Sequence, residues 1–385
     1  MIDFARLTEQ LGAFSAYQRD EAGRHAARLH DACGALDECA ACWEALVERV
    51  EAAQGGPLRA VPRAVPTARY GAPPRPPTVT VVATDGSQIF PDRHTDPSCY
   101  LLNVGRVALH YGTHEPPLMA AEPFFRYRRA ELDALGEDDP AAPDATAEVV
   151  AAMRDELELD WLHRTAAEHR RSGRPLVALA DGTLIRWMLR GMKDRAAGER
   201  FVQRYVAILD RFRDDGLPLA SYISRPGSSE VVNLLRFHRG EPDWEIEPGS
   251  LSGLLDRHLF ERTLAVGERS ALFASRSGVM KAYGDHRIVA FYVRLPGEVG
   301  RVEMPAWAAD AEGGAWVELV HAVVLDQAAK GGGYPIILQE AHERAVVRAQ
   351  EREMFHRLLA QRLRRDGIAA GIAGGKAASK RAPRL

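Results

Sequence analysis

Cysteines and long apolar runs are scarce in this sequence, and each scarcity excludes a class of protein. There are only four cysteines in 385 residues, which is too few for a disulfide scaffold. The single Cys-x-x-Cys pair, Cys39 and Cys42, lacks the second pair or the His-x-x-x-His that a zinc site needs. No apolar run approaches the ~18 residues of a membrane span, and the first residues, MIDFARLTEQLGAF, lack the order of a signal peptide. We therefore expect a cytoplasmic protein with no membrane segment, whose cysteines pack within a helix.

The net charge of the sequence is also small. The formal charge of −3 at pH 7 argues against a surface coated for nonspecific nucleic-acid binding. A local basic groove remains compatible with this charge, because a nuclease needs positive potential only where the phosphate backbone lies. With 46% hydrophobic and 27% charged residues, the chain is expected to fold around a packed core.

The composition divides the chain into four regions. Residues 1–54 have a helical pattern, and we expect a dimer or partner interface there because the apolar stripes must be buried somewhere. Residues 55–77 are rich in proline and glycine and predict a linker. Residues 78–366 alternate between strand and helix patterns, which predicts an α/β domain with a mixed sheet. Residues 367–385 are basic and of low complexity, and we predict that they are disordered.

Several stretches of the α/β region predict individual strands. Residues 78–84 predict a first strand that ends at the following Asp-Gly. Residues 99–112 predict two more strands, separated by a turn or bulge near Gly105. Residues 286–295 and 301–307 predict strands at the edge of the same sheet.

Two Asp-Gly pairs suggest where a functional site lies. Asp85-Gly86-Ser87 and Asp181-Gly182-Thr183 each follow an apolar run. Ligands of open α/β sheets gather at the carboxyl ends of strands, so two parallel neighbouring strands would bring both aspartates to one edge. A turn is the commonest use of Asp-Gly, and one copy would indicate only that. Two copies, each followed by a hydroxyl residue, favour a site.

A helix predicted at residues 147–173 supplies a third carboxylate. At 100° per residue Glu158 falls on its apolar face, whereas Glu156 points well away from that face. An unpaired buried carboxylate costs several kcal/mol or shifts its pKa, so Glu158 needs a partner. That partner is either a local arginine or a metal ion shared with Asp85 and Asp181. Three carboxylates suit Mg²⁺ or Mn²⁺, which prefer hard oxygen ligands.

A glycine-rich turn at residues 331–333 introduces the last candidates. Pro335 suits the first turn of a helix predicted over residues 335–367. His342 lies two turns further along on the same side, where it can serve as a ligand or a proton-transfer group. Tyr334 precedes the helix and can hydrogen-bond a phosphate or the attacking water. The alternative for a lone helical histidine is a structural role.

Taken together, four motifs resemble the NurA family of DNA-end-processing nucleases. They are TDGS at 84–87, RDELEL at 154–159, ADGT at 180–183 and GGGYPIILQEAHE at 331–343, and the resemblance covers roughly residues 78–360. It implies a ribonuclease-H-like core with a mixed β-sheet flanked by helices, here with an N-terminal helical extension. It also implies the catalytic residues Asp85, Glu158, Asp181, Tyr334 and His342, of which all but the tyrosine are metal ligands.

The same resemblance implies an activity and partners. The activity is Mn²⁺-dependent hydrolysis of DNA, with Mg²⁺ as a possible substitute, by 5′→3′ exonuclease and single-strand endonuclease action. The substrates are single-stranded DNA and double-stranded ends, resected in double-strand break repair. The partners are a second copy, forming a homodimer, and a HerA-type hexameric ATPase. Two alternatives stay open: a catalytically weak scaffold for a ring ATPase, and a structure-specific resolvase on the same fold.

Five residues are candidate DNA contacts. Phe124, Phe125 and Arg126 belong to a stretch in which aromatics alternate with arginines, a pattern that can stack bases and hold phosphates. An amphipathic strand is an equal alternative for that stretch. Arg225 lies beside a turn near a strand end and is a candidate phosphate clamp, the alternative being an ordinary surface arginine. Ser87, the hydroxyl residue after the first Asp-Gly, is the fifth candidate.

Overall fold

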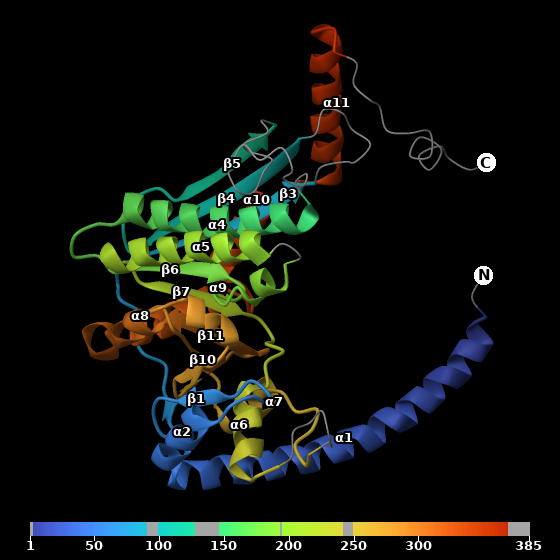
Figure 1. The fold of residues 1–385 in the computed structure, drawn as a ribbon, viewed down its shortest axis with the longest axis vertical. Coiled ribbons are helices and arrows are strands. Elements are labelled where there is room, and N and C mark those ends of the chain that lie inside the picture. Colours follow the sequence, from blue (N-terminus) through green and yellow to red (C-terminus); the bar gives the residue numbers. More distant parts are fainter. Residues whose placement is uncertain (1–2, 91–98, 128–145, 193–194, 242–248, 369–385) are drawn as a thin grey trace.

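A single mixed sheet forms the centre of the computed structural model, which describes residues 3–90, 99–127, 146–192, 195–241 and 249–368 (Figure 1). Its eleven strands follow the order β1-β9-β10-β11-β7-β6-β3-β4-β5, with β2 paired to β8 and β8 to β10. Their bounds are β1 Ala60–Pro62, β2 Arg69–Tyr70, β3 Val79–Ile89, β4 Tyr100–Tyr111, β5 Leu118–Arg126, β6 Leu176–Asp181, β7 Leu219–Ile223, β8 Arg269–Ser270, β9 Phe273–Ser275, β10 Ile288–Arg294 and β11 Val299–Pro305.

The functional half of the sheet is the run β5-β4-β3-β6-β7. Strands β3, β4 and β5 are antiparallel neighbours, whereas β6 lies parallel to β3 and β7 parallel to β6. This order and these directions are those of a ribonuclease-H-like core, and the predicted fold class is confirmed. Because β3, β6 and β7 are parallel, they point their carboxyl ends toward the same edge of the sheet.

Helices cover both faces of these strands (Figure 1). One face packs against α4 (Ala147–His169) and α5 (Arg195–Asp214), and the other against α9 (Ala315–Lys330) and α10 (Ile336–Ala345). Alternation along β3 supplies both contacts, with Val82 in the first core and Val81 and Ala83 in the second. A strand buried on both faces is mostly apolar, which explains the run Val81–Ala83, while the buried hydroxyls of Thr80 and Thr84 hydrogen-bond His110 and the Glu158 carbonyl.

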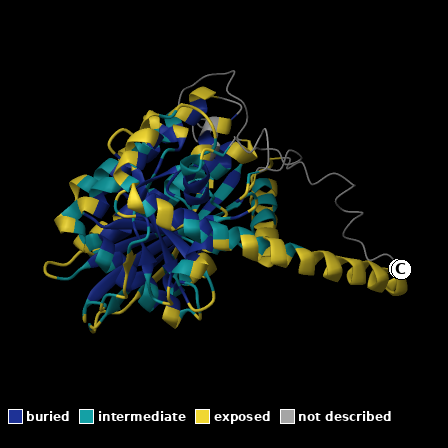
Figure 2. Ribbon diagram, turned by 90° about the horizontal axis from the view of Figure 1, so that it is seen from below, coloured by how far each residue is buried: buried dark blue, intermediate teal, exposed yellow. Residues whose placement is uncertain are grey.

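The N-terminal helices form a third layer at the far end of the sheet. In this layer α1 (Phe4–Ala41) and α2 (Trp43–Ala52) pack with α6 (Glu230–His238) and α7 (Asp256–Thr263). The predicted helical extension is therefore present, and the first half of α1 projects away from the body with its side chains exposed (Figures 1 and 2). Cys39 is buried in this layer, while Cys42 caps α2 and is exposed, so only one of the pair packs within a helix.

The proline-rich interval at 55–77 differs from the expected free linker. It contributes two short strands, because β1 pairs with β9 and β2 with β8. Its arginines bind protein groups: Arg63 pairs with Asp310, and Arg75 with Asp326. This interval ties the N-terminal helices to the sheet.

Two strand predictions need correction. Within residues 99–112 there is one continuous strand, β4 (Tyr100–Tyr111), without a turn at Gly105. The glycine is required there because a Cβ would lie 2.2 Å from the carbonyl oxygen of Ala341, so α10 packs directly on the strand backbone. In addition, β10 and β11 lie inside the sheet, between β9 and β7, and not at its edge.

The C-terminal helix is also different from the prediction, since it is broken at residues 346–348. Helix α10 ends at Ala345, whose carbonyl accepts hydrogen bonds from the Asn103 side-chain amide at 2.8 Å and from the Ser87 hydroxyl. Helix α11 (Ala349–Arg365) then leaves the body (Figure 1). The predicted disordered tail, 367–385, lies outside the described residues from residue 369 onward.

In the part of the chain that the structure describes, every helix is too short or too polar to span a membrane. The remaining helices are η1 Trp187–Gly191, η2 Gly278–Ala282, α8 Ala306–Asp310 and η3 Ala311–Gly314.

Candidate active site

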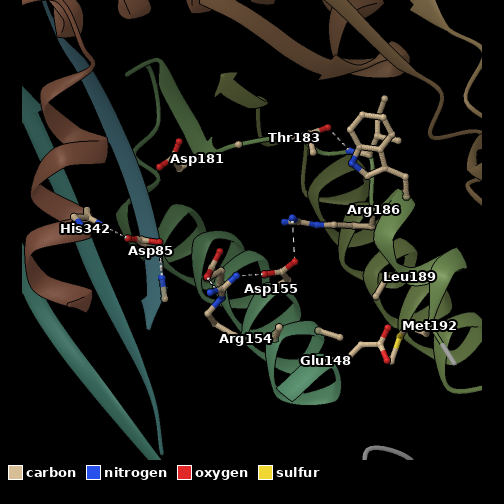
Figure 3. A pocket seen from close by; sticks show the side chains of 17 residues that line it. Asp85, Glu148, Arg154, Asp155, Asp181, Thr183, Arg186, Leu189, Met192 and His342 are labelled. Carbon is tan, nitrogen blue, oxygen red and sulfur yellow. Dashed lines mark hydrogen bonds and ion pairs between the residues drawn. The ribbon is translucent and has the colours of Figure 1, made fainter. Parts of the chain in front are cut away.

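A cavity of about 520 Å³ lies beside Asp85 and Gly86 of β3 and the carboxyl end of β6, between α4, η1 and α10 (Figure 3). All four of the predicted metal ligands line it, although they come from four different elements. Its polar lining consists of Asp85, Glu148, Arg154, Asp155, Glu158, Asp181, Thr183, Arg186 and His342.

Asp85 reaches the cavity from the middle of a strand. The prediction that its strand ends there is wrong, because β3 continues to Ile89 and Asp85 pairs with Gly105 of β4. Its Oδ2 lies 2.7 Å from Nδ1 of His342 (Figure 3), and its Oδ1 accepts a hydrogen bond from the Gly86 amide at 2.8 Å. These contacts fix the carboxylate against α10.

Gly86 makes room for the third carboxylate. A Cβ on Gly86 would lie 2.5 Å from Oε1 of Glu158 and 2.8 Å from Cγ of Arg154. Thr84 fixes the same helix, since its hydroxyl donates to the Glu158 carbonyl at 2.8 Å. The missing side chain of Gly86 therefore lets α4 bring its glutamate beside Asp85.

Glu158 lies in the cavity with a perturbed pKa. Its side chain is 18% exposed, and Oε1 is 3.0 Å from Nε of Arg154. Burial raises the pKa of Glu158 to about 8, and the negative charges of Asp155 and Asp85 act in the same direction. Glu156, by contrast, pairs with Arg204 of α5 at 2.9 Å and does not line the cavity. This placement supports the choice of Glu158 over Glu156.

Asp181 stands at the tip of its strand, as predicted for this residue. Strand β6 ends there, and Gly182 makes a genuine turn with φ of +78°. The enclosing protein raises the pKa of Asp181, the charge of Asp85 adds to that shift, and the hydrogen bond from Tyr334 opposes it. Tyr334, at the start of α10, therefore reaches the site through Asp181.

Two arginines and an aspartate in the cavity were not singled out from the sequence. Arg154 donates to Asp155 at 2.8 Å and pairs with Glu158, while Arg186 lies 3.3 Å from Asp155 (Figure 3). Arg154 and Asp155 begin the RDELEL motif, so that motif contained the signal. Arg186 follows the second Asp-Gly closely, but its direction depends on the packing of its guanidinium 5.0 Å from the ring of Tyr205.

Glu303 is a further residue that sequence reasoning missed. It is 2% exposed, and its Oε2 accepts from the Thr183 hydroxyl at 2.8 Å and from the Leu184 amide at 2.9 Å. Its other oxygen pairs with buried Arg301 at 2.9 Å. This buried ion pair holds the turn that follows Asp181.

The donor chemistry of the cavity fits a divalent cation. In the arrangement seen, no three His, Cys, Asp or Glu side chains of the described part of the chain converge into a ligand cluster. The carboxylates of Asp85, Glu158 and Asp181 are hard oxygen donors, and the charge of Asp85 raises the pKa of the other two. A bound cation would offset that repulsion, as Arg154 does for Glu158 here.

The aromatic candidates for DNA contact lie on the edge strand β5. Phe124 faces α4, 5.8 Å from the ring of Trp161, whereas Phe125 packs 5.7 Å from Phe355 of α11. Arg126 stacks over Phe124 at 5.8 Å. The strand is amphipathic and its two phenylalanines contact different helices, so they do not form one surface, and their contact with DNA stays a prediction.

The two remaining candidates differ in their placement. The hydroxyl of Ser87 donates to the Ala345 carbonyl and so secures α10, while its contact with DNA stays a prediction. Arg225 is exposed just beyond the carboxyl end of β7, with an unusual positive φ of 45°. Strain of this kind gathers at functional sites, and the position agrees with a phosphate contact.

Comparisons with known proteins give related results. A family model described as the NurA domain matches residues 79–347. The fold is similar to the crystal structure of the NurA nuclease from Sulfolobus solfataricus, with 14% identity and a TM-score of 0.50 over 78% of this chain and 88% of that one. A second structure, described as NurA, matches with 11% identity and a TM-score of 0.39 over 75% and 90%. A comparison with curated proteins finds no match.

Proposed function

The chain belongs to the NurA family, and we propose that it is a metal-dependent nuclease that hydrolyses phosphodiester bonds in DNA. One observation carries the proposal. The cavity joins Asp85, Glu158, Asp181 and His342 from elements that are far apart in the sequence. Burial, with a smaller contribution from the charge of Asp85, raises the pKa of Glu158 and of Asp181, and a divalent cation held by these oxygen donors would offset that cost.

Four residues would hold the cation, Mn²⁺ or Mg²⁺: Asp85, Glu158, Asp181 and His342. When bound, such an ion stabilises the charge on the phosphate and lowers the pKa of water. The Asp85 carboxylate orients the imidazole of His342 through Nδ1, which leaves Nε2 for a ligand bond or a proton. Tyr334 orients Asp181 through its hydroxyl.

Cations around the cavity would position the DNA. Arg154 lies between Glu158 and Asp155, so a phosphate entering the site would find a guanidinium beside the carboxylates. Arg225, beyond β7, and Arg126, at the end of β5, would contact the DNA outside the cavity. Arginine is suited to that role because its donors match a phosphate in pairs.

The finer part of the proposal concerns the biological role. We propose 5′→3′ exonuclease and single-strand endonuclease action at DNA ends during double-strand break repair in the cytoplasm. The partners would be a second copy of the chain and a HerA-type hexameric ATPase. The exposed half of α1 supports a helical partner, since Phe4, Leu7, Leu11 and Phe14 repeat at the spacing of a coiled-coil seam.

Cleavage of end-labelled DNA tests this function. Single- and double-stranded substrates are incubated with Mn²⁺, Mg²⁺ or EDTA, using the wild type and Asp85→Asn. We expect metal-dependent cutting by the wild type, at least about 100-fold slower in the variant, with the label giving the polarity. No cutting by the wild type, even with a HerA partner and ATP, would contradict the proposal and favour a scaffold. Cutting confined to branched DNA would favour a resolvase.

A further inference from the structure

A network of buried polar side chains extends from the turn after Asp181 to the N-terminal layer. Ala180 of β6 pairs with Ser221 of β7, and Ser221 pairs with Glu303 of β11. These two small side chains leave room for Glu303 to cross β7 and accept a hydrogen bond from Thr183. The metal chemistry proposed above makes no use of what lies behind Glu303. We call its members, which are all at most 8% exposed, the Arg301 network: Glu303, Arg301, Tyr292, Glu230 and Asp256.

Arg301 is the centre of this network. Its guanidinium lies 2.9 Å from Glu303 and 3.0 Å from Glu230, the first residue of α6. It also donates a hydrogen bond at 3.1 Å to the hydroxyl of Tyr292, its partner on β10. One guanidinium therefore joins the active-site turn to the N-terminal layer.

Asp256 forms the far end of the network, at the start of α7. Its Oδ2 accepts from the Tyr292 hydroxyl at 2.6 Å, and its Oδ1 accepts from the amides of Val231 and Val232 at 3.0 and 2.9 Å. These amides belong to the first turn of α6, where N–H groups lack partners within their own helix. Because α1 packs on both α6 and α7, the network ends in the layer from which α1 projects (Figure 1).

The Arg301 network lies between two apolar cores. Tyr292 stacks on Phe260, with ring centroids 4.4 Å apart, and belongs to the core of the N-terminal layer. Leu184, in the turn after Asp181, belongs to the core beneath α4 and α5. A buried ionic network adds little stability compared with apolar residues of the same volume. Its directional bonds do fix the relative positions of the groups that they join, here the two cores.

The turn after Asp181 is held by hydrogen bonds more than by packing. A Cβ added at Gly182 would meet no atom of the described residues within 4 Å. The Gly182 amide donates to the Tyr222 carbonyl at 3.0 Å. The Tyr283 hydroxyl donates to the Leu184 carbonyl at 2.9 Å, and Glu303 accepts two further hydrogen bonds from the turn. A shift of Glu303 is therefore passed on to this turn.

We propose that the N-terminal layer sets the position of the metal ligand Asp181 through this network, in which Arg301 and Tyr292 are positioning residues. The proposal rests on the metal-dependent nuclease function and adds residues outside the cavity to it. Without the Tyr292 hydroxyl, Arg301 loses one of its acceptors and its hold on Glu303 loosens. The turn after Asp181 then shifts, and the site binds its cation more weakly, as happens when the groups that orient a metal ligand are removed.

Binding of Mn²⁺ alone, followed by the electron paramagnetic resonance signal of the free ion, tests this role without DNA. The variants are Tyr292→Phe, which removes only a hydroxyl from the middle of the network, Thr183→Val at its active-site end, and the double variant. Tyr111→Phe is the matched control, because its hydroxyl accepts a hydrogen bond from Gln327 and Tyr111 pairs with Val79, the first residue of β3. Thermal unfolding midpoints show that every protein is folded at the temperature of the titration.

We expect Tyr292→Phe and Thr183→Val each to weaken Mn²⁺ binding by roughly three- to tenfold, the effect of losing one hydrogen bond that supports a ligand. Because both substitutions act through one network, the double variant should bind about as weakly as the weaker single variant. Independent effects would multiply instead. Tyr111→Phe should bind Mn²⁺ like the wild type.

Three results would overturn the positioning role: wild-type affinity in Tyr292→Phe, a loss in the double variant equal to the product of the two single losses, or the same loss in Tyr111→Phe. No Mn²⁺ binding by the wild type would overturn the metal site and the positioning role together. A wild type that binds Mn²⁺ in the expected pattern but cuts no DNA would keep the positioning role and contradict the nuclease function.

Discussion

The two Asp-Gly pairs look alike in the sequence but have different structures. Asp181-Gly182 ends a strand, and its glycine has a positive φ that few other residues adopt easily. Asp85-Gly86 lies inside a strand that continues to Ile89, and its glycine exists because Glu158 packs where a Cβ would be. The same dipeptide meets a backbone requirement at one position and a steric requirement at the other.

This difference teaches how the site is built. At the first pair the carboxylate is fixed by neighbours in the sheet and by His342, and the helix α4 is packed against it. At the second pair the position of the carboxylate depends on the turn that follows it. Glu303 stabilises that turn by accepting hydrogen bonds from the Thr183 hydroxyl and the Leu184 amide. Substitutions can therefore separate packing at Asp85 from turn support at Asp181.

The largest effect is expected from removing the support of the second pair. Glu303→Ala should lower the free energy of unfolding by about 3–5 kcal/mol, because it removes one of the two carboxylates that pair with buried Arg301 and the acceptor of the Thr183 hydroxyl and the Leu184 amide. Urea denaturation measures this change. Thr183→Val is the matched control, since it removes the two hydrogen bonds of the Thr183 hydroxyl, one to Glu303 and one from the Ile185 amide, and keeps the ion pair; it should cost about 1.5–3 kcal/mol. An equal loss in the two variants would contradict the supporting role of the ion pair.

The free energy of unfolding is expected to depend on pH through buried His321, so the two Asp-Gly pairs must be compared at one pH. Burial and then Arg269 lower the pKa of His321 to about 4 from an ordinary value near 6.5. The unfolded chain thus binds more protons between these values, so stability is full above pH 6.5 and falls by about 3 kcal/mol as the pH drops to 4. His321→Gln keeps a donor for the Gly267 carbonyl and should lose this dependence. Urea denaturation at pH 7 and 4.5 gives the free energy of unfolding of both proteins. An equal fall in that free energy for the wild type and His321→Gln would refute the prediction.

Packing at the first pair is tested by Gly86→Ala. The new methyl group collides with Oε1 and Cγ of Glu158 and with Cγ of Arg154, so stability should fall by about 1–3 kcal/mol. Cleavage should fall about 100-fold, because displacing a catalytic group by about 1 Å has that effect. Rates and unfolding midpoints measured on the same preparations distinguish the two effects. Retained activity would show that Glu158 need not lie beside Gly86.

The smallest effect is expected from Gly182→Ala. Its open surroundings hold no atom within 4 Å of an added Cβ, and only the φ of +78° is unfavourable. We expect a loss of about 1–2 kcal/mol in stability and a cleavage rate within tenfold of the wild type. Gly182→Asn should cost less than Gly182→Ala, since asparagine tolerates this conformation better. If Gly182→Ala slowed cleavage as much as Gly86→Ala does, the proposed difference between the two Asp-Gly pairs would be wrong.

Local signals predicted the second pair and failed at the first for a physical reason. The turn after Asp181 follows from an apolar run that stops at a glycine, which is a local property. At Asp85 the Asp-Gly pair also predicts a turn, but β3 continues because it pairs with β4, where Gly105 lies opposite Asp85. Such tertiary contacts outweigh the low strand propensity of Asp and Gly. Helical phase placed Glu158 correctly because it depends only on neighbours along one helix.

Other parts of the site depend on contacts between distant elements, which a single sequence does not show. Arg186 lines the cavity only because Tyr205 and Asp155 hold it there. Glu303 of β11 reaches Thr183 beyond the end of β6, although β7 lies between these two strands in the sheet. The break after Ala345 depends on Asn103 and on the packing of α10 over β4. In each case the decisive atom belongs to a residue far away in the chain.

The most direct test of the account compares two neighbouring glutamates of α4. Cleavage of labelled single-stranded DNA in Mn²⁺ is measured for the wild type, Glu158→Gln and Glu156→Gln. Glu156 pairs with Arg204 outside the cavity, so it serves as the matched control. The account predicts a loss of about 100-fold or more for Glu158→Gln and less than a few-fold change for Glu156→Gln. Wild-type activity in Glu158→Gln would contradict the claim that this cavity is the nuclease site.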